Sequence, residues 1–372
     1  EFMKPMTSVL SNGKLRVSFG QTGNSNIGNR AISYYQTGNN NEFGGTESIG
    51  VYLSQMGNPD LKWETTTEWN VGLDLGFFNN RLNVTAEYFR KVVSDLLAER
   101  SLLTFNEADK IAANIGKTQS QGFELTINTT NFNSKDFSWN TDFTFSFYRD
   151  KWNTRDASWK PAAYSQYNAP IRYMYGYLSD GLIQPGETVD YMPGSLPGQV
   201  KIKDINGYVY NEDGSVQVDK HGIPLKSGKP DGKLDDADKV IYGSSDPGYL
   251  MGLNNTIRYK NFDFNIYFYG QFNVLNAGSY KDLWLTGADG MTGIVNMYRG
   301  YNMQKSWFVR CRNITVGYTI PVKKALSSIR VYADINNPFT ITPYDGLDLE
   351  TDNSVWAYPN VRSFSLGLDI TF

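Results

Sequence analysis

The chain has 372 residues, of which 35 are Lys or Arg and 38 are Asp or Glu, so its net charge is −3 and it lacks the basic excess of a nucleic-acid-binding protein. It holds one histidine, His221, and one cysteine, Cys311, which excludes a disulfide and a zinc site built from Cys and His. Aromatic residues make up 15% of the chain, and no apolar run is long enough to predict a transmembrane helix.

Alternation of apolar and polar residues with period two predicts β-strands along most of the chain. Near the carboxyl end, for example, Phe364, Leu366 and Leu368 alternate with Ser365 and Gly367. The predicted strands, in chain order, are 14–22, 62–77, 81–98, 118–131, 136–147, 249–260, 262–272, 306–320, 327–338 and 361–372.

The connections between these strands alternate between short and long. Short turns are predicted at 78–80, 131–135, 260–261 and 321–326, and long loops at 23–61, 99–117, 148–248, 273–305 and 339–360. This alternation predicts antiparallel strands with the short turns at one end. Two further strand-like stretches, 173–178 and 200–204, are assigned to the loop 148–248, because a lone extra strand would reverse the direction of those that follow.

Alternation alone fits a soluble β-sandwich with one wet face as well as a transmembrane β-barrel. The strands, however, approach the length that a tilted membrane strand needs, and their polar faces carry charged and amide side chains. The alternating loop lengths also favour the barrel. In that case the side chains predicted to face lipid are Phe137, Phe143, Phe145, Phe264, Ile266, Phe268, Leu366, Leu368 and Ile370.

Five segments, in order along the chain, resemble motifs of the SusC/RagA-type TonB-dependent outer-membrane transporters of Bacteroidota. They are KLRVSFGQTGN at 14–24, NPDLKWE at 58–64, the segment 115–125, NITVGY at 313–318 and the terminal run ending at Phe372. The resemblance implies an all-β fold, the C-terminal ten or so antiparallel strands of a 22-stranded transmembrane β-barrel with long extracellular loops. It also implies that residues 1–372 are the C-terminal portion of one barrel, with a large extracellular loop at about 148–248. The plug and the N-terminal strands would then precede residue 1.

The function implied by the resemblance is import of a nutrient, a glycan or a peptide, by an integral protein of the outer membrane. The implied partners are the remainder of the barrel and its plug, a SusD-like surface lipoprotein, TonB, outer-membrane lipid and the oligosaccharide or peptide substrate. No catalytic residue is predicted. The alternatives are a soluble all-β carbohydrate-binding or adhesion module, and a glycan-degrading enzyme, for which no loop pair supplies the two carboxylates.

A possible calcium site lies in the large loop. In the resembled family an EF-hand-like acidic stretch is often found here, and removing residues 208–230 from this sequence restores it. Its side-chain ligands would be Asp204, Asn206, Asp231, Asp235 and Asp238. The alternative is a solvated acidic turn, and the inserted residues could keep the two halves apart.

The remaining singled-out residues have structural interpretations. His221 is expected to be a surface-loop histidine and Cys311 a packed, inert residue. Arg310 and Arg312 fall on the predicted lipid face of Ile314, so they are expected at headgroup level or in contact with protein. Loop aromatics that suit either substrate recognition or packing, the latter favoured for most, are Tyr164, Tyr167, Tyr173, Tyr175, Tyr177, Trp284, Tyr298, Tyr301, Tyr344, Trp356 and Tyr358.

Overall fold

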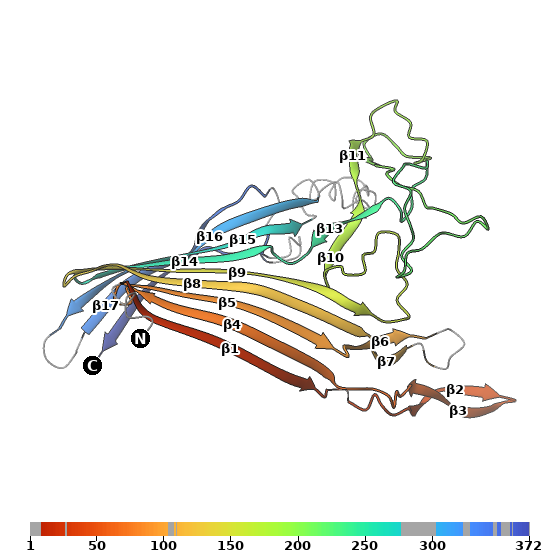
Figure 1. Ribbon diagram of the computed structural model, residues 1–372, viewed down its shortest axis with the longest axis horizontal. Helices are drawn as coiled ribbons and strands as arrows, with labels where there is room; N and C mark the ends of the chain where they lie inside the picture. The colour runs from red at the N-terminus through yellow and green to blue at the C-terminus, as the bar shows by residue number, and fades with distance from the viewer. Residues whose placement is uncertain are drawn as a thin grey trace.

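One large antiparallel sheet dominates the computed structural model, with its loops gathered at one end (Figure 1). The structure describes residues 9–26, 28–102, 108, 110–276, 303–322, 328–344, 348–350, 358 and 360–371. Within these residues, no helix is long and apolar enough to cross a bilayer.

The sheet has ten strands, and each corresponds to one of the ten strands predicted from the sequence. In spatial order, which is also chain order, they are β1 (Leu10–Asn24), β4 (Glu64–Phe77), β5 (Leu82–Ser94), β8 (Gly116–Asn133), β9 (Phe137–Arg155), β14 (Tyr249–Tyr259), β15 (Phe262–Asn276), β16 (Gln304–Pro321), β17 (Ser328–Ile341) and β18 (Ser363–Thr371). Strand β9 extends to Arg155, so the largest loop begins later than the predicted position 148.

The remaining strands form four two-stranded sheets within the long connections. They pair β2 (Tyr34–Phe43) with β3 (Thr46–Gln55), β6 (Leu97–Ser101) with β7 (Lys110–Asn114), β10 (Tyr173–Tyr177) with β13 (Lys239–Ser244), and β11 (Ser179–Leu182) with β12 (Val200–Ile202). The two strand-like stretches assigned to the large loop are therefore strands β10 and β12, outside the main sheet.

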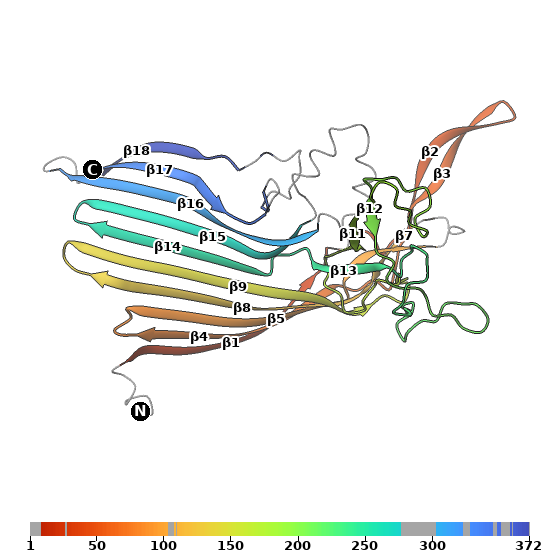
Figure 2. The same ribbon diagram turned by 90° about the horizontal axis from the view of Figure 1, so that it is seen from above.

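Short turns and long connections lie at opposite ends of the sheet, as the alternation of loop lengths predicts (Figure 2). The turn between β4 and β5 shows how a few residues can reverse the chain direction between two strands. It places Asn79 and Asn80 in the left-handed region, at φ 57° and 60°, which asparagine adopts more readily than most residues.

The strand register aligns the apolar side chains across the sheet. Phe264 pairs with Val316, Val316 with Ala333, and Ala333 with Leu366, so one apolar row crosses four strands. The neighbouring row on the opposite face is polar and includes Asn265 beside Thr315. The residues predicted to face lipid thus share one face of the sheet, which is the arrangement that a barrel wall requires.

A row of aromatic residues borders this apolar face near the short turns. Phe137 pairs with Tyr259, Tyr259 with Phe262, and Phe262 with Tyr318. On β14, Tyr249 lies ten residues before Tyr259 and points to the same face. At about 3.3 Å per residue and a tilt of about 40°, the two tyrosines are separated by about 25 Å along the barrel axis, the height of a membrane-facing apolar band with aromatic borders.

The buried apolar clusters of the described residues lie at the loop end of the molecule. One cluster holds Ile183, Val189, Met192, Val200 and Ile202 in the large loop. The other packs Val274, Phe308, Tyr344 and Leu349 where β15 and β16 meet the loop after β17. These cores fix the loops at that end of the sheet.

Candidate functional site

The polar face of the sheet carries arginines that bind carboxylates on other strands. Arg16 of β1 contacts Asp74 of β4 at 2.8 Å and reaches Glu87 of β5 at 3.2 Å. To do so it passes over Gly72, where a Cβ atom would lie 2.8 Å from the guanidinium. A glycine at this position therefore lets one arginine join three strands.

A second arginine near the other edge of the sheet also joins carboxylates on neighbouring strands across a glycine. Arg330 of β17 contacts Asp263 of β15 at 2.6 Å and Asp369 of β18 at 3.1 Å. Gly317 of β16 lies between Arg330 and Asp263, and a Cβ atom there would approach the Asp263 carboxylate to 2.5 Å. The sequence indicated a polar face but gave no sign of these pairings, because each partner lies on a different strand.

Between the two arginine clusters, amide side chains continue the polar face. Asn128 donates to Asp142 at 2.8 Å, and Asn265 donates to the Asn254 side-chain oxygen at 2.8 Å. A surface of ion pairs and amides on one side, with an apolar row on the other, suits a wall between lipid and a water-filled lumen.

Strict alternation fails in β16, and the break determines on which face of the sheet Arg310 lies. A β-bulge leaves Arg312 without a partner in either ladder, so that Arg310 pairs with Tyr269 and Thr340 and shares the polar face of Asn313. The prediction that Arg310 shares the face of Ile314 is therefore wrong, since it assumed an unbroken period of two. The expected contact with protein is confirmed by the ion pairs below.

Arg310 is 4% exposed and is surrounded by acidic side chains from the loop after β17. It binds Asp348 at 2.7 Å and also pairs with Glu350, which pairs in turn with Arg312. The Arg310 Nε group donates to the Thr340 hydroxyl at 2.9 Å. The two arginines thereby attach this loop to the polar face near the loop end of the sheet.

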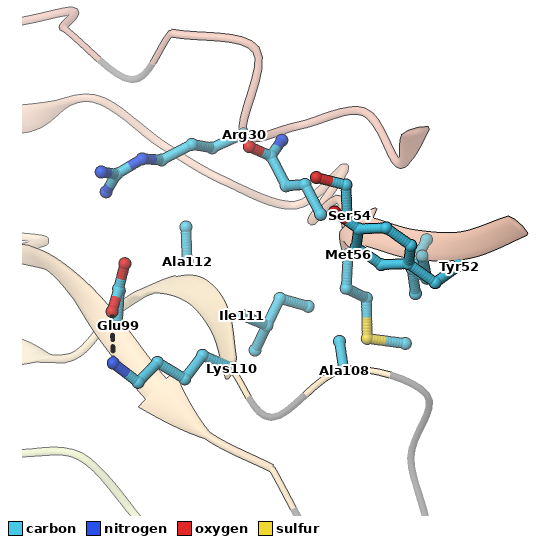
Figure 3. Close-up of a pocket in the computed structure, with 11 residues that line it drawn as sticks. Arg30, Tyr52, Ser54, Met56, Glu99, Ala108, Lys110, Ile111 and Ala112 are labelled. Atoms are coloured by element: carbon cyan, nitrogen blue, oxygen red, sulfur yellow. Dashed lines mark hydrogen bonds and ion pairs between the residues drawn. The ribbon is translucent and has the colours of Figure 1, made fainter. Parts of the chain in front are cut away.

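A cavity of about 560 Å³ lies between the β2–β3 and β6–β7 hairpins (Figure 3). Tyr52, Met56 and Ile111 supply apolar wall, and Arg30 adds a guanidinium. The ion pair between Glu99 and Lys110, at 3.1 Å, borders its charged side (Figure 3). Its volume and mixed lining suit a small polar ligand or a side chain of a partner.

Most of the tyrosines singled out in the large loop are used in packing. Tyr164 stacks on Tyr175 with ring centroids 4.2 Å apart, and the Lys239 ammonium lies over the rings of Tyr164 and Tyr177. Burial raises the pKa of the Tyr177 hydroxyl. Tyr358 is 83% exposed, whereas Tyr344 is buried. Trp284, Tyr298, Tyr301, Trp356 and Phe372 lie outside the described residues.

The two halves of the predicted calcium loop lie together despite the insertion. The Asp204 carboxylate accepts the Gly232 N–H at 2.7 Å. The insertion folds back on itself, because Gly207 and Ser227 exchange hydrogen bonds at its base. The inserted residues therefore do not keep the two halves of the loop apart.

The side chains of this loop mostly accept backbone hydrogen bonds. Asp238 is fully buried and accepts the N–H groups of Ile205, Asn206 and Asp235 at 2.8–3.1 Å. Asp231 accepts the Lys233 N–H at 3.0 Å, Asp235 that of Ala237, and Asn206 that of Gly228. Burial raises the pKa of the Asp235 carboxyl. In the described part of the chain, no three Asp, Glu, His or Cys side chains converge as a metal site.

His221 and Cys311 have packing contacts. His221 is at a turn of the insertion, and its ring stacks on Tyr167 with centroids 3.8 Å apart. Cys311 is fully buried in β16. The sequence gave no indication of the contact with Tyr167, because 53 residues of intervening chain separate the two rings along the sequence.

Comparison with known proteins identifies the family. The family model "TonB dependent receptor-like, beta-barrel" matches residues 7–338. The chain is 30% identical over 409 residues to the TonB-dependent receptor SusC of Bacteroides thetaiotaomicron, covering 100% of this chain and 38% of SusC. It is 27% identical over 422 residues to the TonB-dependent receptor P3 of Formosa agariphila, covering 98% of this chain and 40% of P3. The chain thus spans about two fifths of the length of these relatives.

Solved structures agree on the fold. The RagAB peptide transporter matches 98% of this chain and 41% of its own chain with a TM-score of 0.72 at 20% sequence identity. The RagAB peptide importer in its closed-closed state gives a TM-score of 0.74, also at 20% identity. Together with the alternating sheet and the family model, these matches show that the chain belongs to the TonB-dependent receptor-like β-barrel family and is an integral outer-membrane protein.

Proposed function

We propose that the protein carrying this chain imports a nutrient, a glycan or a peptide, across the outer membrane as a TonB-dependent transporter of the SusCD type. The observation that carries the proposal is the two-sided sheet: an apolar row crosses Phe264 and Leu366, and arginine–carboxylate clusters cover the opposite face. A soluble binding module would have to bury that apolar row against a second protein layer, so the soluble alternative is disfavoured.

This chain's own part in import is to line and shape the passage. The ion-paired polar face provides a hydrated wall, and the loops at one end of the sheet provide much of the mouth. We assign it no catalytic step, since the relatives bear receptor names and the described side chains supply binding and packing contacts.

The test is uptake by cells. A strain lacking the gene should lose uptake of the labelled oligosaccharide or peptide that the wild type imports, and a protonophore should abolish uptake in the wild type. Equal uptake by both strains, for every substrate that supports growth, would contradict the proposal. A protein that stays in solution without detergent would contradict the membrane assignment.

The partners proposed are a SusD-like surface lipoprotein over the mouth, TonB through the rest of the protein, and outer-membrane lipid around the apolar face. We expect the lipoprotein to contact the loops within 148–248, 273–305 and 339–360. The lipoprotein should no longer co-purify after deletion of all three loops. Retained co-purification would contradict this assignment.

Calcium in the large loop is a further proposal. Its support is the all-oxygen donor set and the closeness of Asp204 to the segment 231–238. The carboxylates already accept backbone N–H groups, so an ion would bind the lone pairs that these hydrogen bonds leave free, or replace some of the bonds.

A further inference from the structure

A second cavity, of about 700 Å³, lies between the end of β6 and the segment that follows β9. The outer end of β9 and the residues after it form one wall, with Trp152, Arg155 and Trp159. Arg100 and Ser101 at the end of β6 line it as well. The volume is in the range of small-molecule binding sites.

The centre of this wall is a guanidinium held between two indole rings. The Arg155 Cζ atom lies 4.7 Å from the ring centroid of Trp152 and 4.3 Å from that of Trp159. The Nε and Nη2 groups of Arg155 donate to the carbonyl oxygens of Tyr167 and Gln166, at 3.0 and 3.4 Å. These contacts fix the guanidinium plane, and the Nη1 group donates no hydrogen bond to the residues that the structure describes.

The charges of the cavity do not balance. Its two carboxylates are already paired, Glu99 with Lys110 at 3.1 Å and Asp156 with Arg100. Among the described residues, Arg155 and the exposed Lys160 have no carboxylate within ion-pair distance. Burial lowers the pKa of the Arg155 guanidinium, as expected for a partly dehydrated cation that lacks a counter-ion.

Arg100 supplies a second cationic side chain to the cavity. The Nε–H group of Arg100 is buried and has no hydrogen-bond partner in the described part of the chain. Arg100 lines the cavity, and buried donors are almost always paired, so a bound acceptor or water near this group would complete its hydrogen bonding.

Resting on the proposed import function, we propose that this cavity binds an acidic sugar unit of the transported molecule, with its carboxylate on Arg155 and Lys160. The Nη1 group of Arg155 can donate a charge-assisted hydrogen bond to one carboxylate oxygen, and the Lys160 ammonium can pair with the same carboxylate. A sugar is favoured over a peptide because a pyranose ring presents a flat C–H face, which can stack on the face of either indole ring that is turned away from Arg155. Ser101 and Ser158 add hydroxyl groups that can bond to sugar hydroxyls.

The test uses the complete protein that contains this chain, purified in detergent, with short oligomers of galacturonic acid and of mannuronic acid as probes. Arg155→Gln should raise the Kd of the bound probe by roughly tenfold or more, since it removes a charge-assisted contact. Lys160→Gln should raise it by roughly threefold, because an exposed cation contributes less. Lys160 is on the surface, so this variant keeps the test valid if Arg155→Gln does not fold.

The controls separate charge from general binding. Lys135→Gln removes an exposed cation in the turn between β8 and β9, at the opposite end of the sheet, and should leave the Kd unchanged. Carboxyl-reduced oligomers, which are neutral, should bind weakly and equally to all variants. Raising the salt concentration should weaken binding of the acidic probe.

Three results would overturn the proposal: no binding of either acidic oligomer to the wild type, equal affinity in the wild type and both cavity variants, or binding of oligo-glutamate in place of the sugars. Failure here is distinguishable from failure of the import function. Uptake that depends on the proton motive force and is unaffected by Arg155→Gln and Lys160→Gln would refute this subsite and leave import intact.

Discussion

Replacing Arg310 with methionine should release the loop after β17 from the barrel wall. The Arg310 side chain is 5% exposed and its partner Asp348 is 11% exposed, so the pair is nearly dehydrated. Removing one member of a buried ion pair costs about 3–5 kcal/mol, because the other charge stays buried without a partner. In the variant, Glu350 would still pair with Arg312, and Asp348 would still accept a hydrogen bond from the Asn360 amide at 3.0 Å. The expected cost is therefore the lower end of that range, about 3 kcal/mol.

A cost of about 3 kcal/mol corresponds to a roughly hundredfold rise in the population of the released loop. Hydrogen exchange of the detergent-purified protein, followed by mass spectrometry on peptides covering 339–350, measures that population directly. Arg258→Met is the matched control, since Arg258 is exposed on β14 and outside every described ion pair. Exchange in Arg310→Met no faster than in this control would refute the argument that the ion pairs hold the loop.

Ile266→Arg should cost about 2–4 kcal/mol of folding free energy in lipid vesicles, measured by urea titration, whereas Asn265→Arg on the polar face should cost little; equal costs would reverse the assignment of the faces. Calcium should raise the melting temperature of the wild type and not of Asp231→Ala, and calorimetry that detects no calcium binding would end that proposal. Joining the chain across 208–230 should leave the calcium affinity near normal, because the two halves already touch; a large loss would give the insertion a direct role. Deleting Phe372 should lower the amount of folded protein in the outer membrane while transport per molecule stays near normal, because assembly would recognise the terminal aromatic strand by strand addition; normal abundance with lost transport would contradict this.

The ten strands, their order and the side of each turn could be predicted from the sequence because these properties are local. Period-two alternation is a property of each strand's own residues, although a bulge interrupts it at Arg312 of β16, and the lengths of successive connections fix strand direction. The family motifs, the polar and apolar faces and the placement of 173–178 and 200–204 outside the sheet follow from the same local patterns.

Contacts between distant segments could not be predicted, because they depend on register. The bulge at Arg312 changes the face of Arg310, and no sequence pattern marks it. The contact between Asp204 and Gly232 depends on how the inserted residues fold back.

The sequence by itself therefore determined the wall of the barrel, since a strand's two faces are set by its own alternation. Only the tertiary structure decided the sites at the mouth. The guanidinium of Arg155 between two indoles, the buried ion pairs of Arg310 and the glycine at 317 beneath the Asp263–Arg330 pair each require a specific alignment of neighbouring segments. That alignment is fixed by the packing and hydrogen bonds of the whole sheet and its loops, which no single segment encodes.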